Sequence, residues 1–371
     1  MKLPPFQMER WQSRYEHRVR YNLSESGVEP LTLAELVELT RLPPDELALG
    51  YVQTNGSDLL RERIAALYAG AGPENVVVTS GGAEANYLVL ATLLGSGDGV
   101  TILEPTYGQT PGLAAGLGAR VKSFYLEEER GWQPSPGSAP AAVGPGDRVV
   151  VVTNPNNPTG AILTAAAREE VVDAARTAGA WLLSDEVYAG AEVAGQETRS
   201  LWGDHERSVV TGSLSKAYGL PGLRLGWVVA PSGLAEEIWA AKDYTTIAPA
   251  ALSDAFAACV LDPATRPRIL ERTRRIIREN LGTLSAWLDA RSELFTYLPP
   301  EAGAICYVRY GLKTNSSALA ERLRSEESVL VVPGDHFGMD HYLRIGFGSR
   351  NAELCAALER IARLLERVGQ G

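Results

Sequence analysis

From about residue 46 to residue 260, short runs rich in β-branched residues alternate with longer amphipathic segments. This alternation is typical of a mostly parallel α/β sheet, in which each strand is joined to the next through a helix. We therefore predict a large domain over residues 46–262 with a seven-stranded, mostly parallel sheet. Its expected strands are Val76–Thr79, Val100–Leu103, Arg120–Tyr125, Arg148–Thr153, Trp181–Ser184, Ser208–Thr211 and Leu225–Val229, and its clearest helices are Asp58–Ala69, Ala83–Leu94 and Ala165–Thr177.

The sequence pattern changes after Pro263, where a long charged helix over Arg266–Arg291 is expected. Shorter strands and helices follow it, which predicts a smaller α+β domain over residues 263–371. Residues 1–45 hold little core of their own and are predicted to pack on this C-terminal part, so that the small domain is discontinuous. The Pro- and Gly-rich segment Gln133–Asp147 is predicted to be a surface loop.

The charge balance and the cysteine pattern exclude several classes of function. The 35 Lys and Arg residues against 45 Asp and Glu give a net charge of −10, which is unfavourable for binding nucleic acid or an anionic membrane. Three well-separated cysteines suggest neither a disulfide framework nor a metal knuckle and favour a reducing, cytoplasmic location. The four histidines lack the spacing of a zinc helix, so no metal site is predicted. Neither an export signal nor a membrane span is expected.

Lys216 is the first candidate for catalysis. It follows a predicted strand and the hydroxyl residues Ser213 and Ser215, and Arg224 comes eight residues later. A lone lysine at such a place is more often a solvated surface residue. Together, however, Ser213 and Arg224 could bind a phosphate, because the planar guanidinium matches phosphate oxygens. The combination predicts a phosphorylated ligand beside the amine of Lys216.

Other polar segments follow the predicted strands at their carboxyl ends. Gly81 and Gly82 join a strand to a helix whose free N–H groups could bind an anion, although a tight turn alone would use the same residues. Asn154–Gly160 and Ser184–Tyr188 follow two neighbouring strands, at the edge where open α/β sheets bind ligands. Taken singly, these segments could be ordinary turns or a helix cap. The glycine cluster Gly95–Gly99 precedes a strand and is not interpreted as a dinucleotide fingerprint.

In this order and spacing, the segments resemble the aminotransferase class I/II family, the fold-type I enzymes that use pyridoxal 5′-phosphate. The resemblance extends from about Tyr51 to Phe347. It implies that Lys216 forms the Schiff base with the cofactor, that Asp185 pairs with the pyridine nitrogen, and that the enzyme is a homodimer with shared sites. The remaining implied cofactor contacts are Gly82, Ala83, Tyr107, Asn157, Tyr188, Ser213, Ser215, Arg224 and, from a second subunit, Tyr51.

The chemistry of these roles can be argued from the side chains themselves. A carboxylate at Asp185 would keep the pyridine nitrogen protonated, so that electrons released at the substrate Cα enter the ring. Lys216 would act as general base and then acid. The resemblance implies that Tyr188 hydrogen-bonds the ring's phenolic oxygen. The resemblance also implies that Arg344 binds the substrate α-carboxylate, with Asn157 beside it.

The fold and cofactor do not fix the reaction, because such scaffolds support transamination, elimination, replacement and cyclisation. The segment Tyr21–Val28 departs from the usual glycine-rich opening and resembles capreomycidine synthase-like members, which cyclise hydroxylated arginine. Gly27 in this segment would contact the substrate or simply permit a tight turn. The run Pro300–Ala304 is another departure, because many relatives carry two adjacent glycines there, and Glu301 in this run would favour a cationic substrate if it faced the site.

Three functions follow from these observations. The leading prediction is an aminotransferase of amino acid metabolism or biosynthesis that acts on an L-α-amino acid and uses a 2-oxo acid as amino acceptor. The alternative is a lyase or cyclase that eliminates a β- or γ-substituent and closes a ring. A protein that keeps the fold without chemistry is the third, and the intact Lys216, Asp185 and Arg344 argue against it.

Overall fold

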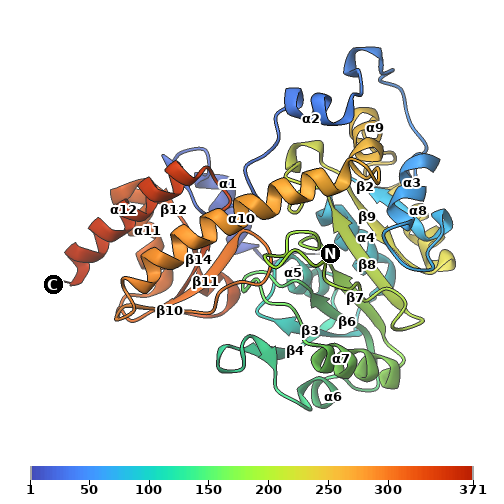
Figure 1. The fold of residues 1–371 in the computed structure, drawn as a ribbon. Coiled ribbons are helices and arrows are strands. Elements are labelled where there is room, and N and C mark those ends of the chain that lie inside the picture. The colour runs from blue at the N-terminus through green and yellow to red at the C-terminus, as the bar shows by residue number, and fades with distance from the viewer. Residues whose placement is uncertain (1, 370–371) are drawn as a thin grey trace.

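The computed structural model describes residues 2–369, with side-chain burial described up to residue 367. Two sheets of very different size lie next to each other, and the long helix α10 (Arg266–Asp289) runs from the large one to the small one (Figure 1). The expected fold, a large α/β sheet with a smaller α+β unit, is confirmed. Among the described helices, none is long and apolar enough to cross a membrane.

The large sheet has the strand order β2-β9-β8-β7-β6-β3-β4-β5. Its central strands β4, β3, β6, β7 and β8 run parallel, whereas β9 is antiparallel to both β2 and β8. All seven predicted strands are present, as β2 (Val76–Thr79), β3 (Gly99–Glu104), β4 (Arg120–Glu127), β6 (Asp147–Thr153), β7 (Trp181–Asp185), β8 (Ser208–Ser213) and β9 (Gly226–Val229).

The prediction of a plain loop over Gln133–Asp147 was wrong. The segment contains an eighth strand, β5 (Gln133–Pro134), and a short helix, α6 (Ser138–Ala142). Side-chain hydrogen bonds to the segment 162–170 hold them. The Gln133 amide of β5 bonds the backbone of residues 162 and 164, and the Glu170 carboxylate accepts N–H groups at the start of α6. Elements of two and five residues are too short to show a periodic hydrophobic pattern.

Helices cover both faces of the large sheet, which explains why the runs Val76–Val78 of β2 and Val149–Val152 of β6 are continuously apolar. Alternate residues of β6 enter different core clusters: Val149 and Val151 pack with α4 (Gly82–Leu93) and α8 (Ser232–Lys242), and Val150 and Val152 pack with α7 (Ala165–Ala178). The other helices near this sheet are α3 (Asp58–Ala65), α5 (Gln109–Gly116) and α9 (Ala251–Val260).

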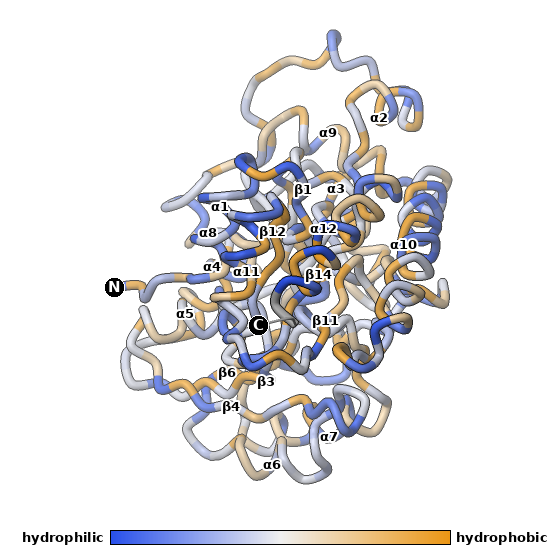
Figure 2. The backbone as a smooth tube through the Cα atoms, turned by 90° about the vertical axis from the view of Figure 1, so that its left-hand side faces the viewer, coloured by the Kyte–Doolittle hydropathy of each residue, from blue (hydrophilic) through white to orange (hydrophobic). Residues whose placement is uncertain are grey.

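The small sheet is antiparallel with the order β10-β11-β14-β13. Its strands are β10 (Phe295–Tyr297), β11 (Ile305–Tyr310), β13 (Val332–Pro333) and β14 (Tyr342–Gly346), accompanied by the helices α11 (Ser316–Glu327) and α12 (Asn351–Gly369). The short strand β12 (Val329–Leu330) is strongly hydrophobic, whereas hydrophilic residues are frequent along α10 and α7 (Figure 2). β12 pairs with β1 outside this sheet. Phe295, Val308 and Ile345 of the sheet lie in one apolar core cluster with residues of α10.

The N-terminal segment contacts both parts of the molecule. Its first helix, α1 (Gln7–Tyr15), contacts β13, and β1 (Tyr21–Asn22) pairs in parallel with β12. The next helix, α2 (Leu33–Thr40), instead contacts α9, which belongs to the predicted large domain. The boundaries at residues 45 and 262 stay a prediction, but the segment reaches from the small sheet to the large one and so crosses the carboxyl ends of β6, β7 and β8.

Candidate active site

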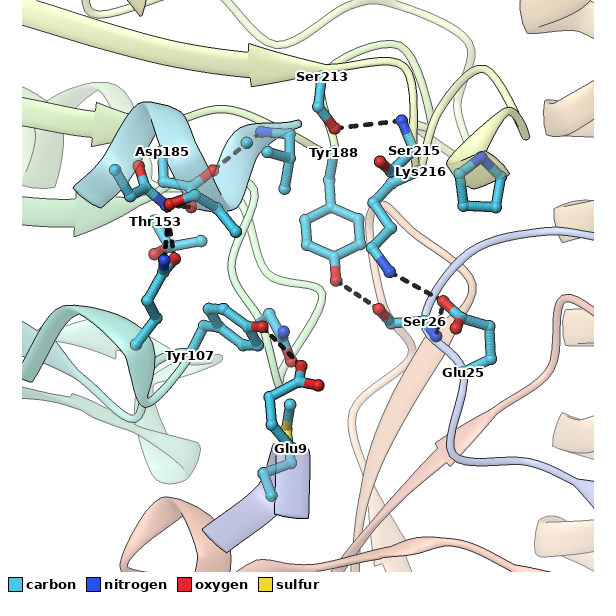
Figure 3. Close-up of a pocket in the computed structure, with 18 of the residues that line it drawn as sticks. Glu9, Glu25, Ser26, Tyr107, Thr153, Asp185, Tyr188, Ser213, Ser215 and Lys216 are labelled. Carbon is cyan, nitrogen blue, oxygen red and sulfur yellow. Dashed lines mark hydrogen bonds and ion pairs between the residues drawn. The ribbon is translucent and has the colours of Figure 1, made fainter. Parts of the chain in front are cut away.

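A cavity of about 350 Å³ lies at the carboxyl ends of β6, β7 and β8, between the start of α4 and the N-terminal segment (Figure 3). Most of the sequence-predicted site residues line it, although they are up to 142 positions apart in the chain. These are Gly82, Ala83, Tyr107, Asn157, Asp185, Tyr188, Ser213, Ser215, Lys216 and Arg224. Tyr51, Gly27 and Arg344 do not line it.

Asp185, at the end of β7, is a buried carboxylate held by hydrogen bonds. Its Oδ2 accepts from Asn86 Nδ2 at 2.8 Å, and its Oδ1 accepts from the Val187 N–H at 3.2 Å. The Asn86 carbonyl in turn accepts from the Thr211 hydroxyl at 2.8 Å. Burial raises the pKa of Asp185, and the donors from Asn86 and Val187 oppose it only in part. A cation placed at this carboxylate would therefore be strongly favoured.

Lys216 follows β8 and directs its amine into the cavity. Its Nζ forms an ion pair with Glu25 Oε1 at 2.8 Å (Figure 3). Burial alone would lower the pKa of Lys216, but the Glu25 carboxylate beside the amine outweighs it, so that the pKa is raised. The same pair lowers the pKa of Glu25 to about 2. Both partners are therefore charged at neutral pH.

The start of α4 forms a polar cradle with Arg224 and the hydroxyls after β8. Gly81 has a φ of +83° and precedes the helix, and a Cβ atom there would lie 2.5 Å from Arg224 Nη2. Ser213 Oγ accepts from the Ser215 N–H at 3.1 Å. Since α4 starts with free N–H groups beside a guanidinium, the cradle suits an anion with several oxygens, such as a phosphate.

Arg344, on β14, lies directly behind the cavity wall. Its Nη1 donates to Asn157 Oδ1 at 2.9 Å and its Nη2 to the Ser24 carbonyl at 2.5 Å. Its buried Nε finds no partner within the described part of the chain. Because the Asn157 carbonyl is engaged by Arg344, the amide N–H groups of Asn157 are left to donate elsewhere.

The two tyrosines of the cavity are bonded to the N-terminal segment. Tyr188 donates from its hydroxyl to Ser26 Oγ at 2.9 Å, and Tyr107 donates to Glu9 Oε1 at 2.6 Å (Figure 3). Burial raises the pKa of Tyr107 further above its usual range. The Tyr107 hydroxyl therefore stays protonated at neutral pH.

Three residues that the sequence singled out lie elsewhere. Tyr51 is 91% exposed and does not reach the cavity of its own chain. The Gly27 N–H donates to Glu25 Oε1 at 3.0 Å. A Cβ at Gly27 would lie 3.3 Å from the Ser215 carbonyl, so this glycine comes close to residues 213–216, which we call the lysine loop. Glu301 accepts from the Ile162 N–H at 3.0 Å and does not line the cavity.

The comparison with protein families decides the assignment. The family model described as aminotransferase class I and II matches residues 41–361, which include every residue of the lysine loop and of the cradle. The chain belongs to the aminotransferase class I and II family.

Relatives within this family differ in the reaction that their names describe. Capreomycidine synthase from Streptomyces vinaceus is 33% identical and the match covers 100% of this chain and 96% of the relative. An arginine–pyruvate transaminase from Pseudomonas aeruginosa is 31% identical over 84% of this chain and 81% of its own. The crystal structure of a PLP-dependent aminotransferase from Streptococcus suis is 34% identical, covers 99% of both chains and has a TM-score of 0.92.

The chain is thus a PLP-dependent class I/II enzyme with the fold-type I architecture. Its cavity fits pyridoxal phosphate on three observations. The buried Asp185 carboxylate has only neutral donors among its hydrogen-bond partners, the cradle at Gly81 and Arg224 suits a phosphate, and a lysine amine lies in the same cavity. An aromatic ring, that of Tyr107, also lines it.

Sequence reasoning missed the contribution of the N-terminal segment to the site. Helix α1 and the residues after it present Met8, Glu9, Gln12 and Glu16 to the cavity, and Glu25 and Ser26 follow. Residues 9, 12 and 16 have the spacing of one helix face, and this pattern could have predicted that their polar side chains point in the same direction. Other missed lining residues are Asn86, Gln109, Thr153, Val187 and Pro221.

Proposed function

We propose that the chain is an aminotransferase for an L-α-amino acid with a positively charged side chain, with a 2-oxo acid as amino acceptor. One observation supports the substrate class above all others. Glu9 and Gln12 of α1 and Glu16, the residue that follows it, line the cavity that holds Lys216, and Glu301 takes no part in it. Carboxylates that face a bound substrate favour a cationic group over a neutral one.

The residues that would hold the cofactor follow from the cavity. Asp185 would pair with the pyridine nitrogen, Tyr107 would stack on the ring, and Asn157 and Tyr188 would hydrogen-bond its phenolic oxygen. Bound pyridoxal phosphate supplies an electron sink for charge that develops at the substrate Cα. The phosphate would be held by Gly82, Ala83, Ser213, Ser215 and Arg224.

The chain's own residues would then position the substrate and move its protons. Arg344 would bind the α-carboxylate, since its Nε is free and its guanidinium lies beside Asn157 at the cavity wall. In its uncharged form, Lys216 would take the proton from the substrate Cα and return it at the adjoining carbon of the cofactor, because its amine lies in the same cavity. Gly27, which supports the close approach to the lysine loop, is proposed to act on the substrate only through that contact.

A homodimer belongs to this proposal. Tyr51 is almost fully exposed in the single chain, which is unusual for a large aromatic side chain. Such exposure is expected for a residue that becomes buried only in the site of a neighbouring subunit. We propose that Tyr51 completes the phosphate site of a second copy.

The experiment compares L-arginine with L-citrulline as amino donors, with pyruvate as acceptor. The two differ in a guanidinium against a neutral ureido group of similar shape. Alanine should form from pyruvate in a one-to-one ratio with the 2-oxo acid product, and arginine should exceed citrulline in kcat/KM by roughly 10- to 100-fold. Glu16→Gln should reduce this preference, whereas Glu38→Gln, on the exposed face of α2, should not. Equal use of both donors would refute the substrate class.

Ring formation is the second candidate, favoured by the match to capreomycidine synthase over the whole chain, including the N-terminal segment that lines the cavity. A hydroxylated arginine incubated without any 2-oxo acid discriminates between the two. Catalytic loss of water with no alanine formed on later addition of pyruvate would establish the cyclase. Release of a 2-oxo acid with amino transfer would establish the aminotransferase.

A further inference from the structure

The residues Ser24–Val28, which we call the strap, cross the site beside Lys216 and are fixed from both ends. Before the strap, the Leu23 N–H donates to the Leu330 carbonyl at 2.8 Å, and the Leu23 carbonyl accepts from Gly346 at 2.7 Å. After it, the Glu29 N–H donates to the Gly348 carbonyl at 2.7 Å. The position of the strap backbone therefore does not depend on its contact with the lysine.

Within the strap, the Glu25 side chain is held by its own backbone. Its Oε1 accepts from the N–H groups of Ser26 at 2.9 Å and Gly27 at 3.0 Å, and the same oxygen contacts Lys216 Nζ at 2.8 Å. Gly27 makes this approach possible, since a Cβ there would lie 3.3 Å from the Ser215 carbonyl and 3.7 Å from Lys216 Cδ. The carboxylate is thus already in place before the lysine amine reaches it (Figure 3).

Lys216 has other charged and titratable neighbours, which come from different elements. Tyr188, after β7, favours the charged amine, whereas Arg344, on β14, opposes it. Asp185, at the end of β7, also lies within electrostatic range. Among these neighbours, Glu25 is the one that contacts the amine directly.

We propose that Glu25 is a positioning residue for Lys216: its carboxylate binds the lysine ammonium whenever that amine is not bonded to the cofactor, and so fixes where the transferable proton lies. This inference rests on the proposed catalytic role of Lys216. The fixed carboxylate keeps the lysine side chain from rotating out of the cavity, and it sets the pH at which the amine gives up its proton. Removing the charge of Glu25 leaves burial as the main influence on the amine, which favours the neutral form.

The test measures the titration of Lys216 in the cofactor-free protein. Acetylation of Lys216 by acetic anhydride is followed as a function of pH by peptide mass spectrometry, and the midpoint of the rate gives the pKa of the amine. For Glu25→Gln, whose side-chain oxygen can still accept from Ser26 and Gly27, the midpoint should fall by about one pH unit or more. Glu25→Asp keeps the charge at a greater distance and should give an intermediate midpoint.

Glu29→Gln is the matched control. It removes the same charge next to the strap, but Glu29 pairs with Arg350 at the surface and makes no contact with Lys216. Its midpoint should equal that of the unchanged protein. An unchanged midpoint in Glu25→Gln, or an equal shift in both variants, would overturn the inference.

A second measurement with cofactor separates this inference from the proposed function. In the loaded enzyme, the acid limb of the kcat–pH profile should move to lower pH in Glu25→Gln, because the free amine then exists at lower pH. If Lys216→Ala still binds the cofactor covalently, the proposed role of Lys216 fails. The acetylation midpoints would nevertheless report whether Glu25 holds the amine.

Discussion

The guanidinium of Arg344 donates to the side-chain carbonyl of Asn157 across 2.9 Å, and so joins the small antiparallel sheet to the loop after β6. Each residue thereby fixes the other. Because Arg344 Nη1 donates to the Asn157 oxygen, the NH₂ group of the Asn157 amide is left to face the cavity. Asn157 in turn holds the guanidinium in an orientation in which its Nε has no partner among the described residues. A residue of one sheet is therefore oriented by a loop of the other.

Arg344→Lys should weaken binding of the amino acid far more than binding of the cofactor. Lysine keeps the charge but loses the planar fork that can bond Asn157 and a carboxylate together. We expect KM for the amino donor to rise roughly 10- to 100-fold, with a smaller change in kcat and a similar dissociation constant for pyridoxal phosphate. Steady-state kinetics and a cofactor titration measure these constants. Arg350→Lys, at an exposed ion pair, provides the control.

Asp185→Asn should lower kcat without preventing attachment of the cofactor to the lysine. The substitution removes the negative charge that a protonated pyridine nitrogen needs, while Asn86 and the Val187 N–H remain close to the side chain. The loss should be of the order of 10²- to 10³-fold, as for other buried electrostatic contacts to developing charge. Thr106→Val, which removes a buried hydroxyl bonded to Thr153, controls for general packing damage. A kcat within twofold of the unchanged enzyme would contradict the role of Asp185.

The strands of the large sheet and the polar residues at their carboxyl ends could be predicted from the sequence, because local residue patterns encode them. β6 is covered by helices on both faces, so its valines form an uninterrupted run that marks a central strand. The polar residues after β6, β7 and β8 could be placed together because parallel strands end at one edge of a sheet. The contact between Glu25 and Lys216 joins residues 191 positions apart, and nothing in the local pattern near residue 25 signals it. The same holds for Asn86 and Asp185, which are 99 positions apart.

Glu186→Gln should remove part of the pH dependence of stability. Burial raises the pKa of Glu186 to about 7, against 4.5 for the unperturbed group. Between pH 4.5 and 7 the folded protein therefore keeps a proton that the unfolded chain has lost, and this contribution, roughly 3 kcal/mol, is complete below pH 4.5 and disappears as pH rises through 7.

Unfolding by urea at pH 5, 6 and 7.5 measures this effect. The glutamine oxygen can still accept from Ser184 and the Leu201 N–H, so the variant should match the unchanged protein at pH 5 and exceed it in stability at pH 7.5. Glu197→Gln is the comparison, since ion pairing with Arg266 lowers the pKa of Glu197 despite its partial burial, and its titration falls below this range. Parallel curves for all three proteins would show that Glu186 is ionised throughout.

Tyr51→Ala and Lys216→Ala should each be poorly active alone and should restore activity when combined. Tyr51 is exposed, so its removal should leave the fold intact, and Lys216→Ala removes the catalytic amine. In a mixed dimer, one site takes Lys216 from the Tyr51 variant and Tyr51 from the Lys216 variant, and is therefore complete. Purification through two different tags keeps only the mixed dimers, and each of these has one complete site of two, so activity should recover to about half of the unmutated level. The proteins are co-expressed with different affinity tags, purified through both tags and assayed with each parent as control. Activity no higher than the average of the parents would show that Tyr51 does not complete a neighbour's site.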